Sequence, residues 1–408
     1  MSVFIDKSPT APGAQKQWMD KISAQFQKQT GVKVSWDSFS SSDEEQRKME
    51  NAVTTGNGPD IFVFGSTFIP SAQATGGFHV LTSNDWKLAG GKSRIFKQQL
   101  TMAGTSPDKL ISVPFSMRPF AMVYNTELFR KAGISSPPKT WTEFVQDAKK
   151  ITDPSQGVYG AEIDPADSYD PWKIWWTFVR QMGGRFVSKD LKTALLDSPE
   201  VQKAVQFWFD WATKYKIADP HSMTWQSTDA LRAFVNGKVG MQIMISTSVE
   251  PTLRNSKVKG KYAFAPMPTV PYGMQQRPPG GEPASTIVSG DYLAVAKYSK
   301  AKDSAYKLIK LMTDYQPQIQ YSKAVGDLPV NKKAATYLAS KSKTAKAFIE
   351  AEQNATPTPM TGAWATLEVA LANVSAKLGN AVAAGNYSPS LVKSLLEKAN
   401  QQVQAQLR

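Results

Sequence analysis

The apolar run at residues 61–64, Ile-Phe-Val-Phe, constrains the fold of this chain more than any other feature. It shows no polar alternation, which is typical of a strand buried on both faces of an α/β sheet. A turn-forming Gly-Asn-Gly-Pro-Asp precedes it, and Gly65, Ser66 and Thr67 follow it before a segment that can form a helix. Ligands of open α/β sheets bind just beyond the ends of such strands. Ser66 and Thr67 are therefore predicted to contact a ligand.

The remaining patterns also predict an α/β fold. Residues 3–6 and 32–39 are expected to be strands, and an amphipathic helix pattern follows each of them. Thr140 is the expected N-cap of a further helix, with Glu143 as its capping-box partner. From residue 301 onward the patterns are mostly helical. Because there is no internal repeat and no long linker, any two domains must be joined by several chain crossings.

The composition excludes several kinds of chemistry. The chain has 408 residues and no cysteine, which rules out a cysteine nucleophile, a disulfide and a thiolate metal site. We interpret its two histidines, His79 and His221, as surface or packing residues, because neither lies near a recognisable partner motif. There is no phosphate loop, nucleophile elbow or zinc-helix motif. A glycoside hydrolase stays open as an alternative, since a pair such as Asp164 and Asp170 could supply two carboxylates.

The net charge is +14, from 48 Lys and Arg against 34 Asp and Glu. The basic residues are scattered, with no block of five or more, so we expect no nucleic-acid partner. An anionic cell-wall polymer or membrane lipid explains the surface charge better. No segment approaches the ~20 apolar residues of a membrane span. Met1 and Ser2 run directly into a predicted strand, so we expect that an export signal, and in a lipoprotein the anchoring cysteine, preceded this sequence.

Six segments occur in the same order in one known protein family: GNGPDIFVF, VPFSMRPFAMVYNTELFRKAGISSPPKTWTEF, AFVNGKVGMQIM, AFAPMPT, DSAYKLIKLMT and GDLPVNKKA. By these segments the chain resembles the extracellular solute-binding proteins of bacterial ABC importers, of the carbohydrate-binding type that includes maltose-binding protein. They span nearly the whole length, and residues 113–144 are the most specific. Two departures exclude a transfer of maltose itself: ISTSVEP follows the GMQIM segment, and Arg118 stands where maltose binders carry an acidic residue.

The resemblance implies an α/β, two-lobe periplasmic-binding-protein-like fold with a hinge of three chain crossings. We expect these near Pro114, Pro268 and Pro329, which divides the chain into two lobes. The expected N-terminal lobe holds residues 1–113 and 267–328, and the C-terminal lobe holds residues 114–266 and 329–408. Closure of such lobes around a ligand is a shift of population toward the closed form.

The implied function is that of an extracytoplasmic carrier, a periplasmic protein or cell-surface lipoprotein, rather than an enzyme. It would capture a sugar, in particular an oligosaccharide, as a monomer without cofactor, metal or catalytic residues, and deliver it to the membrane permease subunits of an ABC importer. A carrier for a non-sugar anion such as a glycerophosphodiester is the alternative, and Arg118 and the basic charge lend it support.

Sugars present hydroxyl groups and flat C–H faces, so a carrier needs polar loop residues and aromatic rings at its site. Tyr169, Asp170 and Trp172 supply both at the expected start of a helix, whereas Trp175 and Trp176 are expected in the core. By the resemblance, Trp364 lies where relatives place a stacking aromatic ring. Arg118 would either donate paired hydrogen bonds to the ligand or form a structural ion pair. The further candidates are Ser8, Ser40, Asp43, Trp225, Ser246, Gly281 and Glu282.

Overall fold

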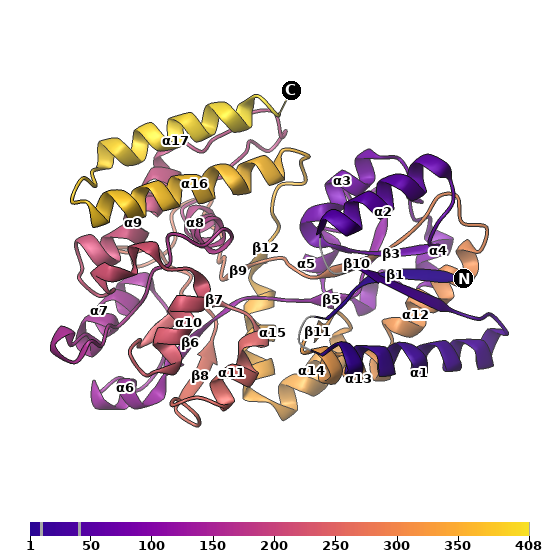
Figure 1. Cartoon of the computed structure of the whole chain (residues 1–408), viewed down its shortest axis with the longest axis horizontal. Helices are drawn as coiled ribbons and strands as arrows, with labels where there is room; N and C mark the ends of the chain where they lie inside the picture. The colour runs from indigo at the N-terminus through magenta and orange to yellow at the C-terminus, as the bar shows by residue number, and fades with distance from the viewer. Residues whose placement is uncertain (9–10, 40–41, 408) are drawn as a thin grey trace. The chain divides into compact units, whose positions relative to one another are not determined.

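The computed structural model describes residues 1–8, 11–39 and 42–407 (Figure 1). The chain forms two compact units. Unit 1 comprises Met1–Pro119 and Val288–Ile349, and unit 2 comprises Phe120–Ile287 and Glu350–Arg408. The chain therefore passes between the units three times.

Two of these passages lie well beyond the expected prolines, because tertiary contacts decide where each unit ends. The Gln181 side chain donates hydrogen bonds to the backbone oxygens of Pro268 and Ala284, which ties that stretch to unit 2. In unit 1, helix α14 (Lys332–Lys341) packs on helix α13 (Tyr315–Val325), so the chain remains in this unit beyond Pro329.

Unit 1 is built on a five-stranded sheet with the order β2-β1-β3-β10-β4. Its strands are β1 (Ser2–Asp6), β2 (Ser35–Phe39), β3 (Ile61–Gly65), β4 (Ser112–Pro114) and β10 (Asp291–Val295). β1 runs parallel to β2 and β3, and β10 runs antiparallel to β3 and β4. Residues 61–64 are almost completely buried, which confirms the predicted strand with two covered faces.

Helices cover both faces of this sheet. Figure 1 shows α2 and α3 on one side and α1 and α13 on the other. The remaining elements of unit 1 are α1 (Pro12–Thr30), α2 (Ser42–Thr55), η1 (Ser66–Phe68), α3 (Ile69–Ala74), α4 (Ser83–Leu88), η2 (Lys92–Arg94), α5 (Lys97–Leu100), β5 (Ser116–Met117), α12 (Lys302–Met312) and β11 (Leu328–Pro329). Helix α15 (Lys343–Gln353) begins in unit 1 and ends in unit 2.

Unit 2 combines a small antiparallel sheet with a thick helical layer. The sheet has the order β7-β6-β8, and a short parallel pair joins β9 to β12. Figure 1 shows α16 and α17 side by side, and they pack on α8 and α9. The elements are β6 (Ala121–Asn125), α6 (Thr126–Lys131), α7 (Trp141–Ile151), η3 (Pro154–Gln156), α8 (Asp170–Gln181), α9 (Pro199–Thr213), η4 (Pro220–Thr224), α10 (Ser227–Val235), β7 (Met241–Ile245), η5 (Thr247–Val249), α11 (Glu250–Arg254), β8 (Tyr262–Ala265), β9 (Thr286–Ile287), β12 (Ala355–Thr356), α16 (Trp364–Ala383) and α17 (Pro389–Gln404).

Two local predictions in unit 2 are confirmed. Thr140 caps α7, and its hydroxyl accepts the backbone N–H of Glu143 while the Glu143 carboxylate accepts the backbone N–H of Thr140. Trp175 and Trp176 lie in the core, where they join three further buried tryptophans of this unit: Trp141, Trp208 and Trp211. Both signals depend on residues close in sequence, which explains why they could be recognised without the fold.

Candidate functional site

Carboxylates surround the Arg118 guanidinium at one edge of the unit 1 sheet. β1 ends at Asp6 on this edge, and Asp291 begins β10 there because β10 is antiparallel to β3. Arg118 donates from Nη1 and Nη2 to the two oxygens of Asp291, at 2.8 and 2.5 Å, and from Nε to Asp327 Oδ1 at 2.9 Å. Asp6 Oδ2 lies 3.6 Å from Arg118 Nη2. Arg118 thus binds Asp291 through two parallel hydrogen bonds and also binds Asp327. Bidentate, charge-assisted hydrogen bonds of this kind are among the strong ones in proteins.

This edge holds more negative than positive groups. Burial, and then the charge of Asp291, raise the pKa of Asp6 to about 7. Burial also raises the pKa of Glu45, on α2, to about 8, with Asp291 and Asp6 as the next causes. Within the part of the chain that the structure describes, Asp6 Oδ1 and Glu45 Oε1 are buried without a hydrogen-bond partner. We call Asp6, Glu45, Arg118, Asp291 and Asp327 the Arg118 cluster.

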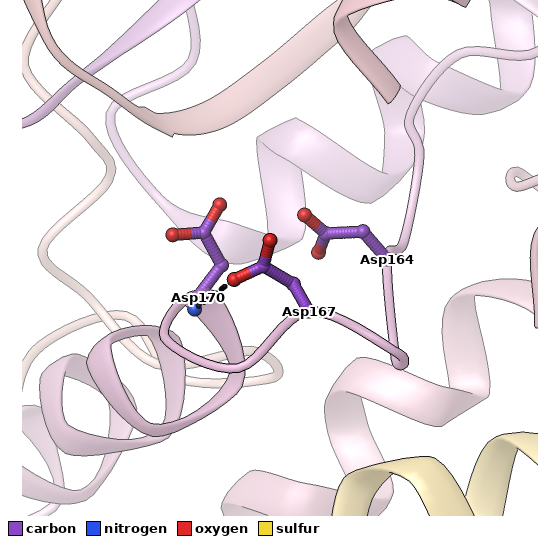
Figure 2. A group of neighbouring side chains, drawn as sticks. All are labelled: Asp164, Asp167 and Asp170. Carbon is purple, nitrogen blue, oxygen red and sulfur yellow. Dashed lines mark hydrogen bonds between the residues drawn. The ribbon is translucent and has the colours of Figure 1, made fainter. Parts of the chain in front are cut away.

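A second acidic group lies in unit 2, in the loop that leads into α8. Asp164, Asp167 and Asp170 each offer one carboxylate oxygen, and these oxygens lie within 4.8 Å of one another (Figure 2). Asp167 accepts the backbone N–H groups of Tyr169 and Asp170 at 2.8 and 3.0 Å, which curves the loop around its side chain. Lys173 Nζ lies 2.5 Å from Asp170 Oδ1. We call Asp164, Asp167 and Asp170 the aspartate cluster.

The environments of these carboxyl groups differ. Burial, and then the charge of Asp170, raise the pKa of Glu162 to about 8. Burial and then the charge of Glu162 raise the pKa of Asp164 well above its ordinary value. For Asp167 burial acts in the same direction, but the backbone hydrogen bonds from Tyr169 and Asp170 outweigh it, and its pKa is lowered. The cluster therefore pairs a firmly ionised carboxylate with one that resists ionisation.

Residues 9–319 match the family of bacterial extracellular solute-binding proteins. The chain belongs to this family. It is 27% identical over 367 residues to the diacetylchitobiose binding protein DasA of Streptomyces coelicolor, with coverage of 86% of this chain and 78% of DasA. It is 25% identical over 301 residues to a putative binding protein of Brucella abortus, with coverage of 71% of this chain and 66%, just under two thirds, of that protein.

A solved structure bears out the fold of this solute-binding protein. The sugar-binding protein MalE of the phytopathogen Xanthomonas citri superposes with a TM-score of 0.81 at 19% identity, over 100% of this chain and 97% of MalE. The predicted family and the two-lobe α/β fold are therefore confirmed. Membership of an extracellular family implies a location outside the cytoplasm. Across the described ranges, no helix has both the length and the apolar character needed to cross a membrane.

In unit 1 of the solute-binding protein, only some of the predicted site residues lie near the Arg118 cluster. Ser66 begins η1 directly after β3, where Gly65 is opposite Asp291, and Thr67 beside it is exposed. The buried Ser8 hydroxyl accepts the N–H of Ala11, which is a helix-start contact. For Asp43 the structure describes only the backbone, at the start of α2, and Ser40 lies outside the described residues.

In unit 2, the predicted aromatic residues separate into one exposed ring and two buried rings. Tyr169, which precedes α8, is 61% exposed. Trp172 and Trp364 are both 3% exposed, and their rings meet edge to face with centroids 5.2 Å apart. Trp364 Nε1 also donates to Glu368 Oε1 at 2.8 Å. Trp172 and Trp364 thus belong to the core of this unit, and contact of either with a ligand stays a prediction.

The other candidates in unit 2 lie in two places. Trp225 is half-buried, and its backbone oxygen accepts the N–H of Ala166, beside the aspartate cluster. Ser246 follows β7, and its hydroxyl bonds that of Ser248. Gly281 and Glu282 pack instead at the C-terminal end of α8, where Glu282 forms an ion pair with Arg180. That end lies roughly 16 Å along the helix from Asp170, so the structure does not bring these two residues to the aspartate cluster.

Several charged residues of both clusters were not predicted as site residues. Asp6 ends the predicted strand at residues 3–6, and Asp291 directly precedes the apolar run at residues 292–296; both positions are signals that could have found them. Asp327 and Glu45 carry no such signal, because a loop and a helix bring them to the edge of the sheet. Asp170 was predicted to contact the ligand, Asp164 was considered only as its partner in a catalytic pair, and Lys173 was not considered.

We expect the stability of unit 1 to depend on pH through Glu45. The pKa of Glu45 is about 8 in the folded protein, against an ordinary value of 4.5. Between these values the folded state keeps a proton that the unfolded chain has released, so the free energy of unfolding falls as pH rises. The slope is ~1.4 kcal/mol per pH unit for this group. Above about pH 8 the group is ionised in both states, and the loss stops.

Urea unfolding of the wild-type protein and Glu45→Gln at pH 5, 6, 7 and 8 measures this effect. Glutamine mimics the protonated group, so the two proteins should match near pH 5, and the variant should become progressively more stable toward pH 8. Parallel stability curves would show that Glu45 ionises normally in the folded protein.

Proposed function

We propose that this solute-binding protein captures a sugar, in particular an oligosaccharide, outside the cytoplasm and delivers it to the permease subunits of an ABC importer. The match of residues 9–319 to the family is the observation that carries the proposal. The names of its relatives support the ligand class, since DasA is a diacetylchitobiose binding protein and MalE a sugar-binding protein. The protein would act as a monomer, either periplasmic or held at the cell surface as a lipoprotein.

The charges favour a ligand rich in hydroxyl groups. Carboxylates accept hydrogen bonds from sugar hydroxyls, and these charge-assisted bonds are roughly twice as strong as neutral ones. The Arg118 cluster offers four carboxyl groups, and the aspartate cluster offers three with Glu162 beside them. Tyr169 supplies an exposed ring that could cover the flat face of a sugar.

The same charges argue against a phosphodiester as the ligand. The Arg118 guanidinium, on which that alternative depended, is already shared among Asp6, Asp291 and Asp327. A phosphodiester placed at either cluster would face several carboxylates, and like charges in close contact repel. A neutral solute avoids this repulsion.

We also propose that the protein is not an enzyme. A glycoside hydrolase needs two carboxyl groups about 5 to 10 Å apart, with room for the sugar between them. In the aspartate cluster one oxygen from each of Asp164, Asp167 and Asp170 lies within 4.8 Å of the other two, and Lys173 forms an ion pair with Asp170. This spacing is shorter than the separation that glycoside hydrolases use, which argues against Asp164 and Asp170 as a catalytic pair.

Calorimetric titration against a panel of neutral oligosaccharides, monosaccharides and glycerophosphodiesters tests the function. We expect saturable binding of at least one neutral oligosaccharide, no binding of phosphodiesters, and unaltered sugar after prolonged incubation. Tyr169→Ala should weaken sugar binding by roughly tenfold, which corresponds to about 1.4 kcal/mol. Tyr337→Ala, which removes an exposed ring from unit 1, is the control and should bind normally. Binding of anions alone, or the appearance of shortened sugars, would contradict the proposal.

A further inference from the structure

The aspartate cluster has the dimensions of a calcium site. Figure 2 shows the carboxylates of Asp164, Asp167 and Asp170 gathered along one side of the loop before α8. One oxygen from each lies within 4.8 Å of the other two. Calcium binds oxygen ligands at about 2.3 to 2.6 Å, so oxygens on opposite sides of one ion are roughly 4.6 to 5.2 Å apart. The three oxygens can therefore contact the same ion with little movement.

A fourth carboxylate, Glu162, gives an independent indication of a cation. Glu162 is 4% exposed, and it accepts a hydrogen bond from the backbone of Ile243. Its Oε2 atom is buried with no partner among the described residues. Glu162 lies two residues before Asp164 in the chain, and the two carboxyl groups interact electrostatically. A buried carboxylate oxygen without a partner is costly unless a ligand completes its surroundings.

We propose that Asp164, Asp167 and Asp170, with Glu162 beside them, bind a divalent cation of the calcium type. The ammonium group of Lys173 contacts Asp170 and makes no ion pair with the other three carboxyl groups among the described residues. A doubly charged ion would compensate the carboxyl groups that Lys173 does not contact. Calcium suits the site better than magnesium, because calcium accepts irregular sets of oxygen ligands whereas magnesium demands near-ideal octahedral geometry.

Three hydrogen bonds fix the orientation of the Asp167 carboxylate. Its Oδ1 accepts the N–H groups of Tyr169 and Asp170, and its Oδ2 accepts the N–H of Ser227 at 3.1 Å. Each carboxylate oxygen can accept further contacts, and metal-binding carboxylates are commonly oriented by such bonds. A bound ion would fasten the loop that carries Tyr169 to the start of α8. No metal site was predicted here from the sequence.

Terbium luminescence tests the site on the full chain after chelator treatment, without any sugar. Trp172 is two residues from Asp170, so tryptophan excitation should sensitise a bound Tb³⁺ ion. We expect one saturable ion per chain, displaced by Ca²⁺ at lower concentration than by Mg²⁺. Asp164→Asn and Glu162→Gln should each weaken Tb³⁺ binding by roughly tenfold or more. Asp190→Asn, which changes a carboxylate elsewhere in unit 2, should leave it unchanged.

Glu162→Gln keeps the size of the side chain and its acceptor for Ile243, so it separates loss of the ion from loss of the fold. Circular dichroism should confirm that both variants are folded. Absence of saturable luminescence in the wild-type protein would overturn the proposal, and so would equal Tb³⁺ affinity in all four proteins. Stabilisation by an amine such as glucosamine, but not by Ca²⁺, would also overturn it and would assign the cluster to a cationic solute. Binding of neutral sugars is measured separately by calorimetry, so failure of the ion site and failure of the proposed function can be told apart.

Discussion

Replacing Arg118 by methionine should lower the free energy of unfolding of unit 1 by about 2 to 4 kcal/mol at pH 7. The variant leaves Asp291, which is 3% exposed, and Asp327 without their cation. Removing one partner of a fully buried ion pair costs about 3 to 5 kcal/mol, because the other charge stays buried and uncompensated. The Arg118 side chain is 34% exposed, so solvent screening reduces the expected effect below that of a fully buried pair.

Arg254→Met is the matched control, because Arg254 forms a 2.8 Å ion pair with Glu250 at the surface. Exposed pairs of this kind contribute roughly 0 to 1 kcal/mol. Chemical denaturation followed by tryptophan fluorescence measures both variants. The loss in free energy of unfolding caused by Arg118→Met should become smaller at low pH, because protonated carboxyl groups carry no charge that needs a partner. A loss below about 1 kcal/mol at pH 7 would show that the pair is not buried in solution.

Trp364→Ala should destabilise unit 2 by about 3 to 5 kcal/mol, the usual cost of truncating a buried tryptophan. Trp364 is 3% exposed, and it packs edge to face on Trp172 and Trp176. Trp364→Phe keeps a ring but loses the hydrogen bond to Glu368, so about 1 kcal/mol is expected. Val369→Ala, at an exposed position of the same helix, should change stability by less than about 0.5 kcal/mol.

Trp364→Phe also separates packing from ligand contact, because this variant should remain folded. If Trp364 stacks on a sugar, as the resemblance implies, the phenylalanine variant should bind more weakly in calorimetry at nearly unchanged stability. If Trp364 only fills the core, the affinity should stay the same. An alanine variant with an unchanged melting temperature would contradict the burial of this ring.

The local predictions that succeeded depend on residues near one another in sequence. The capping box of Thr140 and Glu143 spans one helical turn, and the strand at residues 61–64 is identified by its own apolar side chains. The family resemblance likewise rests on contiguous segments and their order. Such patterns can be recognised without knowledge of the fold, because secondary-structure propensity and local backbone hydrogen bonding act over a few residues.

The boundaries of the two units could not be predicted in the same way. Prolines suggested crossings near Pro268 and Pro329, but the chain stays with its unit as far as Ile287 and Ile349. The hydrogen bonds from Gln181 to Pro268 and Ala284 keep the chain with unit 2 beyond Pro268. They join positions about a hundred residues apart in the chain. A proline restricts its own backbone but carries no information about what packs against it.

The sequence by itself determined the α/β class, the family and the order of the elements, because these follow from local patterns along the chain. Only the tertiary structure decided which charges meet and which rings are buried. Arg118 is surrounded by Asp6, Asp291 and Asp327, which come from distant parts of the chain, and Trp364 packs on Trp172 in the core. Charge compensation and burial are properties of neighbours in space, and no spacing along the chain encodes those neighbours.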